Sequence, residues 1–284
     1  MNKILKTKEI NAELNYIVSN LYNFSTNSIE LKKRGKELAH QITDNYLKKN
    51  DLYYVFKFKG KNLNKLKDKI ILFSSFFGKT VGQNFKNEKF IEVSPDKKKI
   101  QKYKKIQDEK LRYHQTNKGG SIHTDGPQLN LPPKILIMGC LNNKVRGGHT
   151  ILVNGIRIFG NLKKKYPNLA RVFKKNFYFE RRGFEKKNQY LFKPIFENKN
   201  SFKMRYLSEY ITTAYKNKNL KLSKKRRRAL EVLNRELENK KNQRRLKMQR
   251  GDIILINNHI IAHGRTSFSI DNNNKRKLLR IWTN

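Results

Sequence analysis

Apolar residues recur at near-helical spacing in the N-terminal part of the chain. Residues 28–49 carry four of them, at Leu31, Leu38, Ile42 and Tyr46. Asn27 or Ser28 can cap this segment, so the spacing predicts a helix over residues 28–49. A second helix-like pattern runs from Leu63 to Phe77. Between the two, Leu52 to Phe58 is apolar and aromatic, which indicates a strand.

Short apolar stretches dominate the chain from Ile135 onward. The strand candidates, rich in Ile, Leu, Val, Phe and Tyr, are residues 135–141, 149–153, 176–181, 190–196, 253–257, 259–263 and 277–282. Helical patterns interrupt them at residues 155–174 and 222–247. Many short strands with a few helices are typical of a β-sandwich or jelly roll, here with helices packed on one side. In such a double-sheet barrel, strands that are distant in the sequence end at the same mouth.

The domain organisation follows from length and composition. The chain has 284 residues, of which 37% are apolar, and it shows neither an internal repeat nor a Pro/Gly/Ser-rich linker. This apolar content is enough for a sizeable core and argues against global disorder. We predict an N-terminal helical extension over residues 1–50 and one jelly-roll domain over residues 51–284. Residues 95–118 are polar and rich in Lys and Gln, which indicates a long loop, often a lid or binding loop.

The formal net charge of +43 allows two interpretations. One is a partner with a negative surface, such as nucleic acid. The other is a general enrichment in Lys and Asn, as an AT-rich genome would favour. The charge is spread through every segment, and its densest run, residues 224–228, opens a segment with helical periodicity. We therefore expect a small-molecule substrate, anionic or zwitterionic, and not nucleic acid; the sequence does not indicate an oligomeric state.

Cysteine content and hydropathy restrict the class of protein further. The only cysteine, Cys140, lies in an apolar run and is expected to be a buried small hydrophobe. A single cysteine excludes a disulfide framework and a multi-cysteine zinc site. The N-terminal segment has no apolar stretch typical of a signal peptide, and no segment has the roughly 18 continuous apolar residues of a membrane span. We expect a cytoplasmic protein that does not bind a membrane.

Two histidines and one aspartate can form a metal site. His123 and Asp125 are separated by one residue, so in an extended segment both side chains point to the same face. A distant second histidine, His263, would complete the two imidazoles and one carboxylate of a facial Fe(II) site, whose opposite face stays open. The alternatives are an exposed loop histidine at His123 and a hydrogen-bonded histidine in a buried hairpin at His263. His259 belongs to no metal-binding pattern in the sequence, and we expect it not to bind the metal.

A C-terminal strand candidate carries two arginines on one face. In a strand, Arg276, Leu278 and Arg280 would point the same way, toward the barrel interior or its mouth. Two arginines that face inward need carboxylate or other anionic partners. A structural salt bridge is the alternative to a ligand.

Together these elements resemble one family. The matching stretches are residues 119–127 (Gly-Gly-Ser-Ile-His-Thr-Asp-Gly-Pro), 147–153 (Gly-Gly-His-Thr-Ile-Leu-Val), 258–268 (Asn-x4-His-Gly-Arg-Thr-Ser-Phe) and 276–282 (Arg-x3-Arg-Ile-Trp). In order and spacing they are similar to the taurine dioxygenase / clavaminate synthase-like (TauD/TfdA) superfamily of Fe(II)- and 2-oxoglutarate-dependent oxygenases. The resemblance covers roughly residues 70–284. It implies a mainly β fold with flanking helices around a double-stranded β-helix core, jelly-roll and cupin-like.

The resemblance also implies roles for individual residues. It makes His123, Asp125 and His263 the iron ligands. Thr150 falls where the family places a hydroxyl that bonds the distal carboxylate of 2-oxoglutarate. Arg276 falls where the family places the arginine that grips the same carboxylate. The implied cofactors are Fe(II), 2-oxoglutarate as cosubstrate, and O2.

Other positions are implied on the substrate side of the site. Arg280 would lie near the metal-bound end of the cosubstrate or near a substrate anion. Gln83 and Asn84 resemble a segment that lines the substrate side, with a turn as the alternative. Halogenating relatives replace the carboxylate ligand by a small residue, so Asp125 disfavours halogenation. His149 is next to Thr150 and would face the opposite way in a strand, so it is not expected to be a ligand.

The implied activity is hydroxylation of an unactivated C–H bond in a small acid-bearing substrate, such as an amino acid or a derivative, with release of succinate and CO2. Oxygenation of a taurine-like sulfonate or of a betaine is the alternative within the family. Residues 131–136 resemble the γ-butyrobetaine hydroxylase branch, but the single cysteine excludes that branch's cysteine-rich zinc module. An alternative from another class is a basic nucleic-acid-binding protein with a vestigial metal site.

Overall fold

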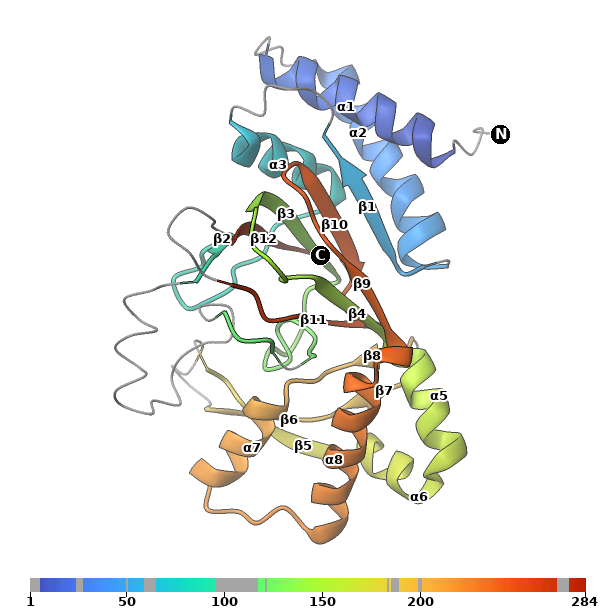
Figure 1. The fold of residues 1–284 in the computed structure, drawn as a ribbon, viewed down its shortest axis with the longest axis vertical. Coiled ribbons are helices and arrows are strands. Elements are labelled where there is room, and N and C mark those ends of the chain that lie inside the picture. Colours follow the sequence, from blue (N-terminus) through green and yellow to red (C-terminus); the bar gives the residue numbers. More distant parts are fainter. Residues whose placement is uncertain are drawn as a thin grey trace.

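Two antiparallel β-sheets form the centre of the molecule, and helices lie at both ends (Figure 1). The structure is a computed structural model, and it describes residues 6–23, 28–49, 51–58, 65–95, 117–120, 122–182, 184, 189–198, 201–269 and 276–284. Most of the predicted loop over residues 95–118 lies outside the described residues. None of the described helices is both long and apolar enough to cross a membrane.

The larger sheet has five strands in the order β1-β10-β3-β12-β2. In chain order they are β1 (Tyr53–Lys57), β2 (Phe90–Val93), β3 (Ile135–Asn143), β10 (Asp252–Asn257) and β12 (Arg276–Thr283). Every neighbouring pair is antiparallel. The aliphatic runs in β3 and β10 account for their central positions, since a strand buried on both faces needs apolar residues on both.

The smaller sheet has the order β11-β4-β9 and faces the larger sheet. Its strands are β4 (Thr150–Asn154), β9 (Gln243–Leu246) and β11 (Ile261–Arg265). Residues of both sheets share one buried apolar cluster, which includes Leu152, Ile261, Leu278 and Trp282. Cys140 belongs to the same cluster and is fully buried, as predicted. The predicted β-rich, two-sheet architecture is thus confirmed.

Helices near the N-terminus cover the outer face of the larger sheet (Figure 1). They are α1 (Thr7–Asn23), α2 (Ile29–Ile42) with a π-helical turn η1 (Thr43–Leu47), and α3 (Leu66–Ser74) with a 3-10 turn η2 (Ser75–Phe77). Leu14 and Leu38 pack in one buried cluster with Phe56, Ile137 and Ile281 of the sheet. Ser28 caps α2 by accepting a hydrogen bond from the Leu31 amide at 3.1 Å, which confirms the predicted cap.

A second group of elements packs against the smaller sheet at the other end of the molecule (Figure 1). Its helices are α5 (Gly155–Lys165), α6 (Pro167–Ala170), η4 (Arg171–Lys174), α7 (Ser208–Asn217), α8 (Lys224–Glu238) and η5 (Lys240–Asn242). Its strands pair as β5 (Asn176–Glu180) with β6 (Tyr190–Pro194), and β7 (Phe196–Glu197) with β8 (Lys203–Met204). Ile151, Val153 and Ala262 of the smaller sheet join its core.

Three details differ from the sequence-based prediction. Helices pack on both outer faces of the two sheets, whereas the prediction placed them on one side. The helix predicted over residues 155–174 is divided where Pro167 follows Tyr166, because proline cannot donate the backbone hydrogen bond that a continuous helix needs. The helix predicted over residues 222–247 ends at Glu238, and residues 243–246 form β9, so the prediction is wrong there.

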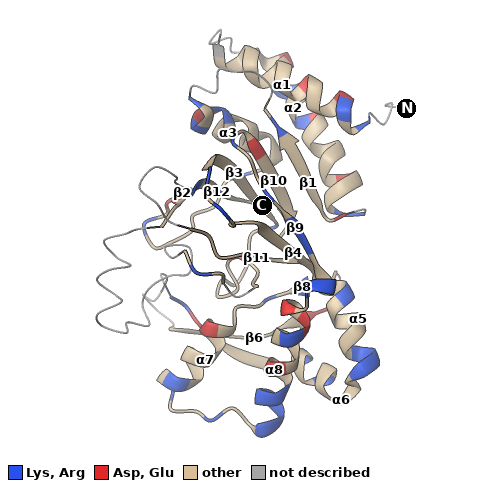
Figure 2. Cartoon of the chain, in the orientation of Figure 1, with Lys and Arg blue, Asp and Glu red and all other residues tan. Residues whose placement is uncertain are grey.

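The basic residues are distributed over the whole fold. In Figure 2, Lys and Arg lie on helices at both ends of the molecule and on β9. The dense run over residues 224–228 forms the first turns of α8, as the helical periodicity predicted.

Candidate active site

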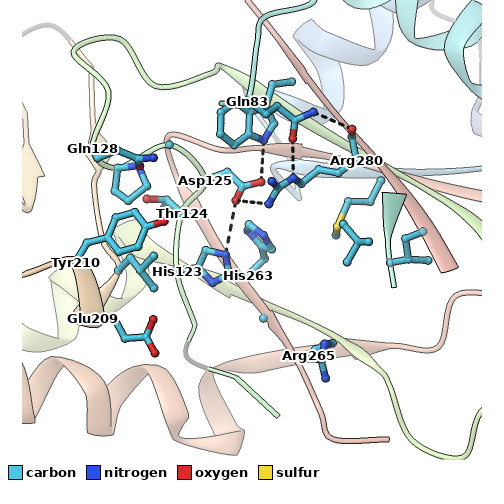
Figure 3. Close-up of a pocket in the computed structure, with 18 of the residues that line it drawn as sticks. Gln83, His123, Thr124, Asp125, Gln128, Glu209, Tyr210, His263, Arg265 and Arg280 are labelled. Atoms are coloured by element: carbon cyan, nitrogen blue, oxygen red, sulfur yellow. Dashed lines mark hydrogen bonds and ion pairs between the residues drawn. The ribbon is translucent and has the colours of Figure 1, made fainter. Parts of the chain in front are cut away.

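A pocket opens between the two sheets and is lined by residues from β3, β4, β11 and β12 together with the loop that follows His123 (Figure 3). His123, Asp125 and His263 meet in this pocket, and each offers a ligand atom within 4.8 Å of the others. All three residues are buried, at 8%, 4% and 6% exposure. The structure therefore brings together three residues that the sequence spreads over 141 positions (123 to 263, both included).

Backbone pairing explains why the two histidines meet. The amide of His123 donates to the carbonyl of His263 at 2.9 Å, and the amide of His263 donates back at 2.7 Å. Residues that exchange both hydrogen bonds lie directly opposite each other, so their side chains emerge on the same face. The imidazole centroids are 4.5 Å apart. Asp125, two positions after His123, points to that face as the strand alternation predicted.

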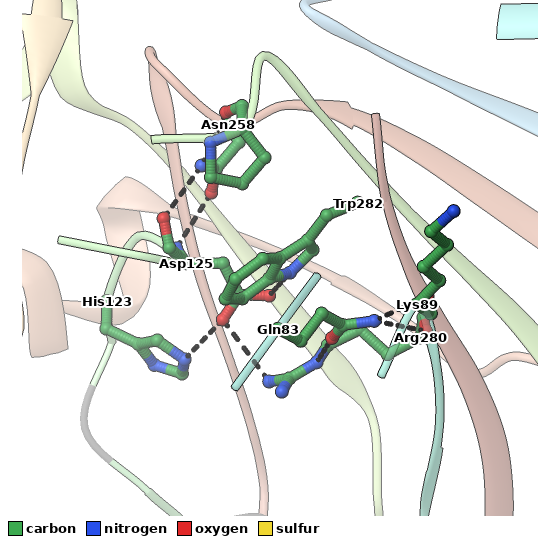
Figure 4. A network of polar contacts seen from close by, with 8 residues as sticks. Gln83, Lys89, His123, Asp125, Asn258, Arg280 and Trp282 are labelled. Atoms are coloured by element: carbon green, nitrogen blue, oxygen red, sulfur yellow. Dashed lines mark hydrogen bonds and ion pairs between the residues drawn. The ribbon is translucent and has the colours of Figure 1, made fainter. Parts of the chain in front are cut away.

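The carboxylate of Asp125 is held from several sides (Figure 4). Trp282 donates from Nε1 to Oδ2 at 2.8 Å, and Arg280 donates from Nη1 to Oδ1 at 3.4 Å. Asn258 fixes the backbone by accepting from the Asp125 amide at 2.8 Å and donating to the Asp125 carbonyl at 2.9 Å. Asn258 is itself 1% exposed and also donates to the carbonyl of Pro133. These contacts leave the carboxylate little freedom to rotate.

The electrostatics favour the protonation states that bind a metal. Burial alone would raise the pKa of Asp125, but the positive charge of Arg280, the hydrogen bond with His123 and the nearby imidazoles hold this pKa well below its ordinary value. Burial, helped by His123, lowers the pKa of His263 to about 3. An anionic carboxylate and a neutral imidazole are the forms that ligate metals.

The donor set fits Fe(II). Two imidazoles and one carboxylate on one face are typical of non-haem Fe(II) oxygenases. Within the described residues, no further His, Cys, Asp or Glu joins the group, so its remaining side stays open for other ligands, unlike a closed four-ligand structural site. The Nδ1 atom of His263 is buried and has no hydrogen-bond partner among the described residues. Of the other histidines, His259 contacts the carbonyl of Pro132 through Nε2 and is not in the group.

Thr150 and Arg276 line the same pocket and are almost fully buried, at 1% and 4% exposure. Oγ1 of Thr150 is buried and has no hydrogen-bond partner in the described part of the chain. Gly148 has a φ of +69°, and a Cβ there would come within 3.2 Å of the Arg276 side chain. The Gly-Gly turn thus lets the backbone pass close to this arginine. The arrangement forms a small basic compartment beside the metal ligands.

Arg265 belongs to this compartment, although the sequence analysis gave it no role. It pairs directly with Thr150 across β11 and β4 and is 5% exposed. Its guanidinium lies 4.7 Å from the ring of Phe268, and that of Arg276 lies 5.6 Å from the same ring. The position of Arg265 two residues after His263 in a strand was the signal that could have identified it, since such residues share a face.

The remaining predicted residues have different surroundings. Arg276, Leu278 and Arg280 all line the pocket, as their spacing predicted. Arg280 donates from Nε to Oε1 of Gln83 at 2.7 Å besides contacting Asp125, so the expected carboxylate partner of this arginine is Asp125. Gln83 lines the pocket, and its amide donates to two backbone carbonyls.

Asn84 closes a turn. Its Oδ1 accepts hydrogen bonds from the amides of Lys86 and Glu88 at 3.1 and 3.2 Å, and its amide nitrogen donates to the Glu88 carboxylate. This geometry is the turn that the sequence analysis kept as the alternative to a substrate contact. A role of Asn84 in substrate binding stays a prediction.

The pocket is also lined by residues to which the sequence analysis assigned no role. They are Thr124, Gln128, Arg182, Leu207, Glu209 and Tyr210. Figure 3 shows Gln128, Glu209 and Tyr210 on one side of the metal ligands and Arg265 and Arg280 on the other. Glu209 and Tyr210 stand in the first turn of α7, which follows the short strand β8.

A family model described as "Taurine catabolism dioxygenase TauD, TfdA family" matches residues 55–282. The chain belongs to this family. The predicted resemblance is therefore confirmed, over a somewhat longer stretch than the motifs alone covered. Membership agrees with the His-Asp-His group and with an enzyme of the dioxygenase class.

Among curated proteins, the gamma-butyrobetaine dioxygenases of Homo sapiens and Pongo abelii are each 33% identical over 57 residues. This match spans 20% of this chain and only 15% of each relative. It is therefore a local similarity.

Solved structures share the whole fold. An asparagine oxygenase in complex with Fe(II), 2S,3S-3-hydroxyasparagine and succinate superposes with a TM-score of 0.74 at 12% identity, over 98% of this chain and 92% of that one. The non-haem iron oxygenase OrfP in complex with Fe and alpha-ketoglutaric acid gives 0.68 at 14% identity, over 98% and 92%. The predicted jelly-roll fold with flanking helices is confirmed by this likeness.

Proposed function

We propose that the protein is an Fe(II)- and 2-oxoglutarate-dependent dioxygenase that hydroxylates an unactivated C–H bond of a small acid-bearing substrate, such as an amino acid or a derivative, and releases succinate and CO2. The observation that carries this proposal is the convergence of His123, Asp125 and His263 in one buried pocket with Arg276 and Thr150 beside them. Family membership supports the same reaction class.

Each residue of the pocket has a part in this proposal. His123, Asp125 and His263 would hold the iron, which together with 2-oxoglutarate and O2 supplies the oxidising chemistry. Arg276 and Thr150 would bind the distal carboxylate of 2-oxoglutarate, because a guanidinium and a hydroxyl are matched donors for a carboxylate. Oγ1 of Thr150 is buried without a hydrogen-bond partner among the described residues, and the carboxylate of 2-oxoglutarate would supply that partner. Arg280 and Trp282 keep the Asp125 carboxylate ionised and oriented.

The charge of the pocket supports a substrate with an acid group. Four arginines line it, at positions 182, 265, 276 and 280, against the carboxylates of Asp125 and Glu209. The arginine excess favours anions over neutral compounds. Two of the structural neighbours carry hydroxylated amino acids, 3-hydroxyasparagine and (3S)-hydroxy-L-Arg, in their complexes. We therefore favour an amino acid or a derivative over a sulfonate.

Two other functions are less well supported. The local similarity to gamma-butyrobetaine dioxygenases keeps a betaine substrate as a second candidate. Nucleic-acid binding would need basic residues gathered on one surface with interleaved aromatics. Figure 2 instead shows basic residues at both ends of the fold, so we propose a small-molecule substrate.

The division of the chain is also a proposal. All proposed site residues lie within residues 51–284, which we take as the catalytic jelly-roll domain. Residues 1–50 would be a helical extension whose part is to cover the outer face of the larger sheet, where α1 and α2 share its apolar cluster.

Succinate formation tests the proposed function. Purified protein supplied with Fe(II), 2-oxoglutarate and O2 should form succinate when the right member of a panel of amino acids, betaines and sulfonates is added. The variant Asp125→Ala should form none above background, because two imidazoles alone do not complete the facial site. Asp68→Ala, which removes an exposed carboxylate from α3, is the matched control and should behave as wild type. Normal succinate formation by Asp125→Ala would contradict the proposal.

A further inference from the structure

Glu209 is the acidic residue on the side of the pocket where Figure 3 also shows Gln128 and Tyr210, which we call the substrate end. Apart from Asp125, it is the only Asp or Glu among the described residues that line the pocket. The chain has 65 Lys and Arg against 22 Asp and Glu, so an acidic side chain has many available partners. Glu180, Glu92 and Asp252 each pair with a nearby Lys or Arg. Glu209 is an exposed residue at the edge of the pocket, its carboxylate makes no hydrogen bond or ion pair with any residue in the described ranges, and it points toward the pocket in Figure 3.

Gln128 adds a second polar group at the same end. It is 5% exposed and lines the pocket, and its Oε1 is buried without a hydrogen-bond partner in the described part of the chain. Its backbone is fixed from behind, because Arg205 donates to the carbonyls of Pro127 and Leu129, on either side of it, at 2.8 and 2.5 Å. The last torsion of a glutamine side chain is broad, so rotation can turn this oxygen toward a ligand. A buried acceptor without a donor is destabilising, and a ligand N–H would supply one.

The aromatic faces in the pocket already carry cations. The guanidinium of Arg182 lies 5.3 Å from the ring of Tyr210, and that of Arg280 lies 5.2 Å from the ring of Trp282. Quaternary ammonium groups are typically bound by cages of aromatic faces, since they have no N–H to donate. This pocket instead offers carboxylate and amide oxygens, which are hydrogen-bond acceptors for N–H groups.

From these observations we infer that the substrate carries an ammonium group with N–H bonds, and that Glu209 binds it while Gln128 accepts a second hydrogen bond. This inference rests on the proposed function and narrows its substrate class to zwitterions whose acid group faces the side of the pocket with Arg265 and Arg280 and whose amine faces α7. It places quaternary betaines outside that class. Glu209 is then a specificity-determining residue.

Binding to anaerobic protein loaded with Fe(II) and 2-oxoglutarate tests the inference by calorimetry. The probes are the proteinogenic amino acids and taurine, and each one that binds is compared with its N-acetyl and N-trimethyl forms. We expect at least one free amine to bind, and both of its modified forms to bind at least about tenfold more weakly, as expected for the loss of a charged hydrogen bond.

Glu209→Gln keeps the shape of the side chain and removes its charge. It should weaken binding of the amine by about ten- to a hundredfold and raise KM more than it lowers kcat, with the affinity for 2-oxoglutarate unchanged. Gln128→Met, of similar volume, should weaken amine binding by a smaller factor. Glu238→Gln, an exposed glutamate at the end of α8, is the matched control and should bind as wild type.

The possible outcomes distinguish a failure of the amine-binding inference from a failure of the proposed function. Equal binding of an N-trimethyl form, an unchanged amine affinity in Glu209→Gln, or binding of 2-oxoglutarate with no amine bound would overturn the inference and leave the proposed function standing. Failure of the iron-loaded wild-type protein to bind 2-oxoglutarate would overturn the proposed function itself.

Discussion

The metal end and the substrate end of the pocket are built differently. At the metal end, the functional side chains stand on paired strands, and Asp125 alone receives hydrogen bonds from Trp282 and Arg280 while Asn258 fixes its backbone. At the substrate end, Gln128 stands on a loop and the exposed Glu209 on a helix; Oε1 of Gln128 is buried without a partner among the described residues, and the Glu209 carboxylate pairs with none of them. A tightly hydrogen-bonded group of side chains thus adjoins an end whose polar side chains have no partner among the described residues.

This difference also explains what the sequence could predict. The convergence of His123, Asp125 and His263, with Arg276 in the same pocket, was predictable because strand alternation and family spacing place these residues on one face. The sequence did not predict that Gln128 and Glu209 line the pocket. Their position depends on how residues 205–210 and the loop after Asp125 pack together, and a periodic pattern of apolar residues does not predict such packing. Arg280 was expected near the metal-bound end of the cosubstrate or near a substrate anion, yet its contacts with Asp125 and Gln83 depend on the relative position of β12 and a distant loop.

The secondary structure also divides into strands that the sequence predicted and a strand that it did not. Strands with long aliphatic runs, such as β3 and β10, were predicted nearly to their ends. β9 was taken for the end of a helix because its sequence, Gln-Arg-Arg-Leu, is polar and its strand identity comes from pairing with β4. Tertiary pairing overrides local propensity in such short edge strands.

The largest effect at the metal end is expected from Arg276. Arg276→Gln should raise the KM for 2-oxoglutarate by roughly a hundredfold, since it removes a charged donor to a carboxylate in a buried site. Steady-state kinetics at saturating substrate would measure it. Arg245→Gln on β9, an exposed arginine, is the control. A KM within twofold of wild type would show that the arginine compartment does not bind the cosubstrate.

Trp282→Phe tests whether the contacts behind Asp125 matter. It removes the Nε1 hydrogen bond to Oδ2 and keeps an aromatic ring. Because partners behind a metal ligand typically alter metal affinity by about ten- to a hundredfold, Fe(II) should bind at least about tenfold more weakly. Anaerobic Fe(II) titration measures the change, and the thermal unfolding of the metal-free variant shows whether the fold is intact. Unchanged iron affinity in a folded variant would contradict the claim that the hydrogen bond from Trp282 to Asp125 supports metal binding.

Asn258→Ala tests whether the hydrogen bonds of Asn258 to the Asp125 backbone stabilise the fold. The side chain of Asn258 makes three hydrogen bonds in a fully buried position, to the amide and carbonyl of Asp125 and to the carbonyl of Pro133. Their loss leaves buried backbone groups without partners, so the free energy of unfolding should fall by at least about 2 kcal/mol. Urea denaturation measures it. A decrease in the free energy of unfolding below about 0.5 kcal/mol, the range of ordinary surface substitutions, would show that these hydrogen bonds do not stabilise the fold.

Asn84→Ala should have the smallest effect on catalysis. Its side chain caps a turn with Lys86 and Glu88, so we expect a modest loss of stability, about 1 kcal/mol, and kcat/KM within about twofold of wild type. Gln83→Ala, which removes the partner of Arg280, is the contrast and should lower kcat/KM more. A strong defect in Asn84→Ala alone would restore its predicted role in substrate binding.

The most direct test of the central claim is anaerobic calorimetry of Fe(II) and 2-oxoglutarate binding to wild type and His263→Ala. The account predicts one Fe(II) per wild-type chain, 2-oxoglutarate that binds far more tightly once iron is present, and neither effect in the variant. Iron bound equally well by His263→Ala, or 2-oxoglutarate bound equally well without iron, would contradict it.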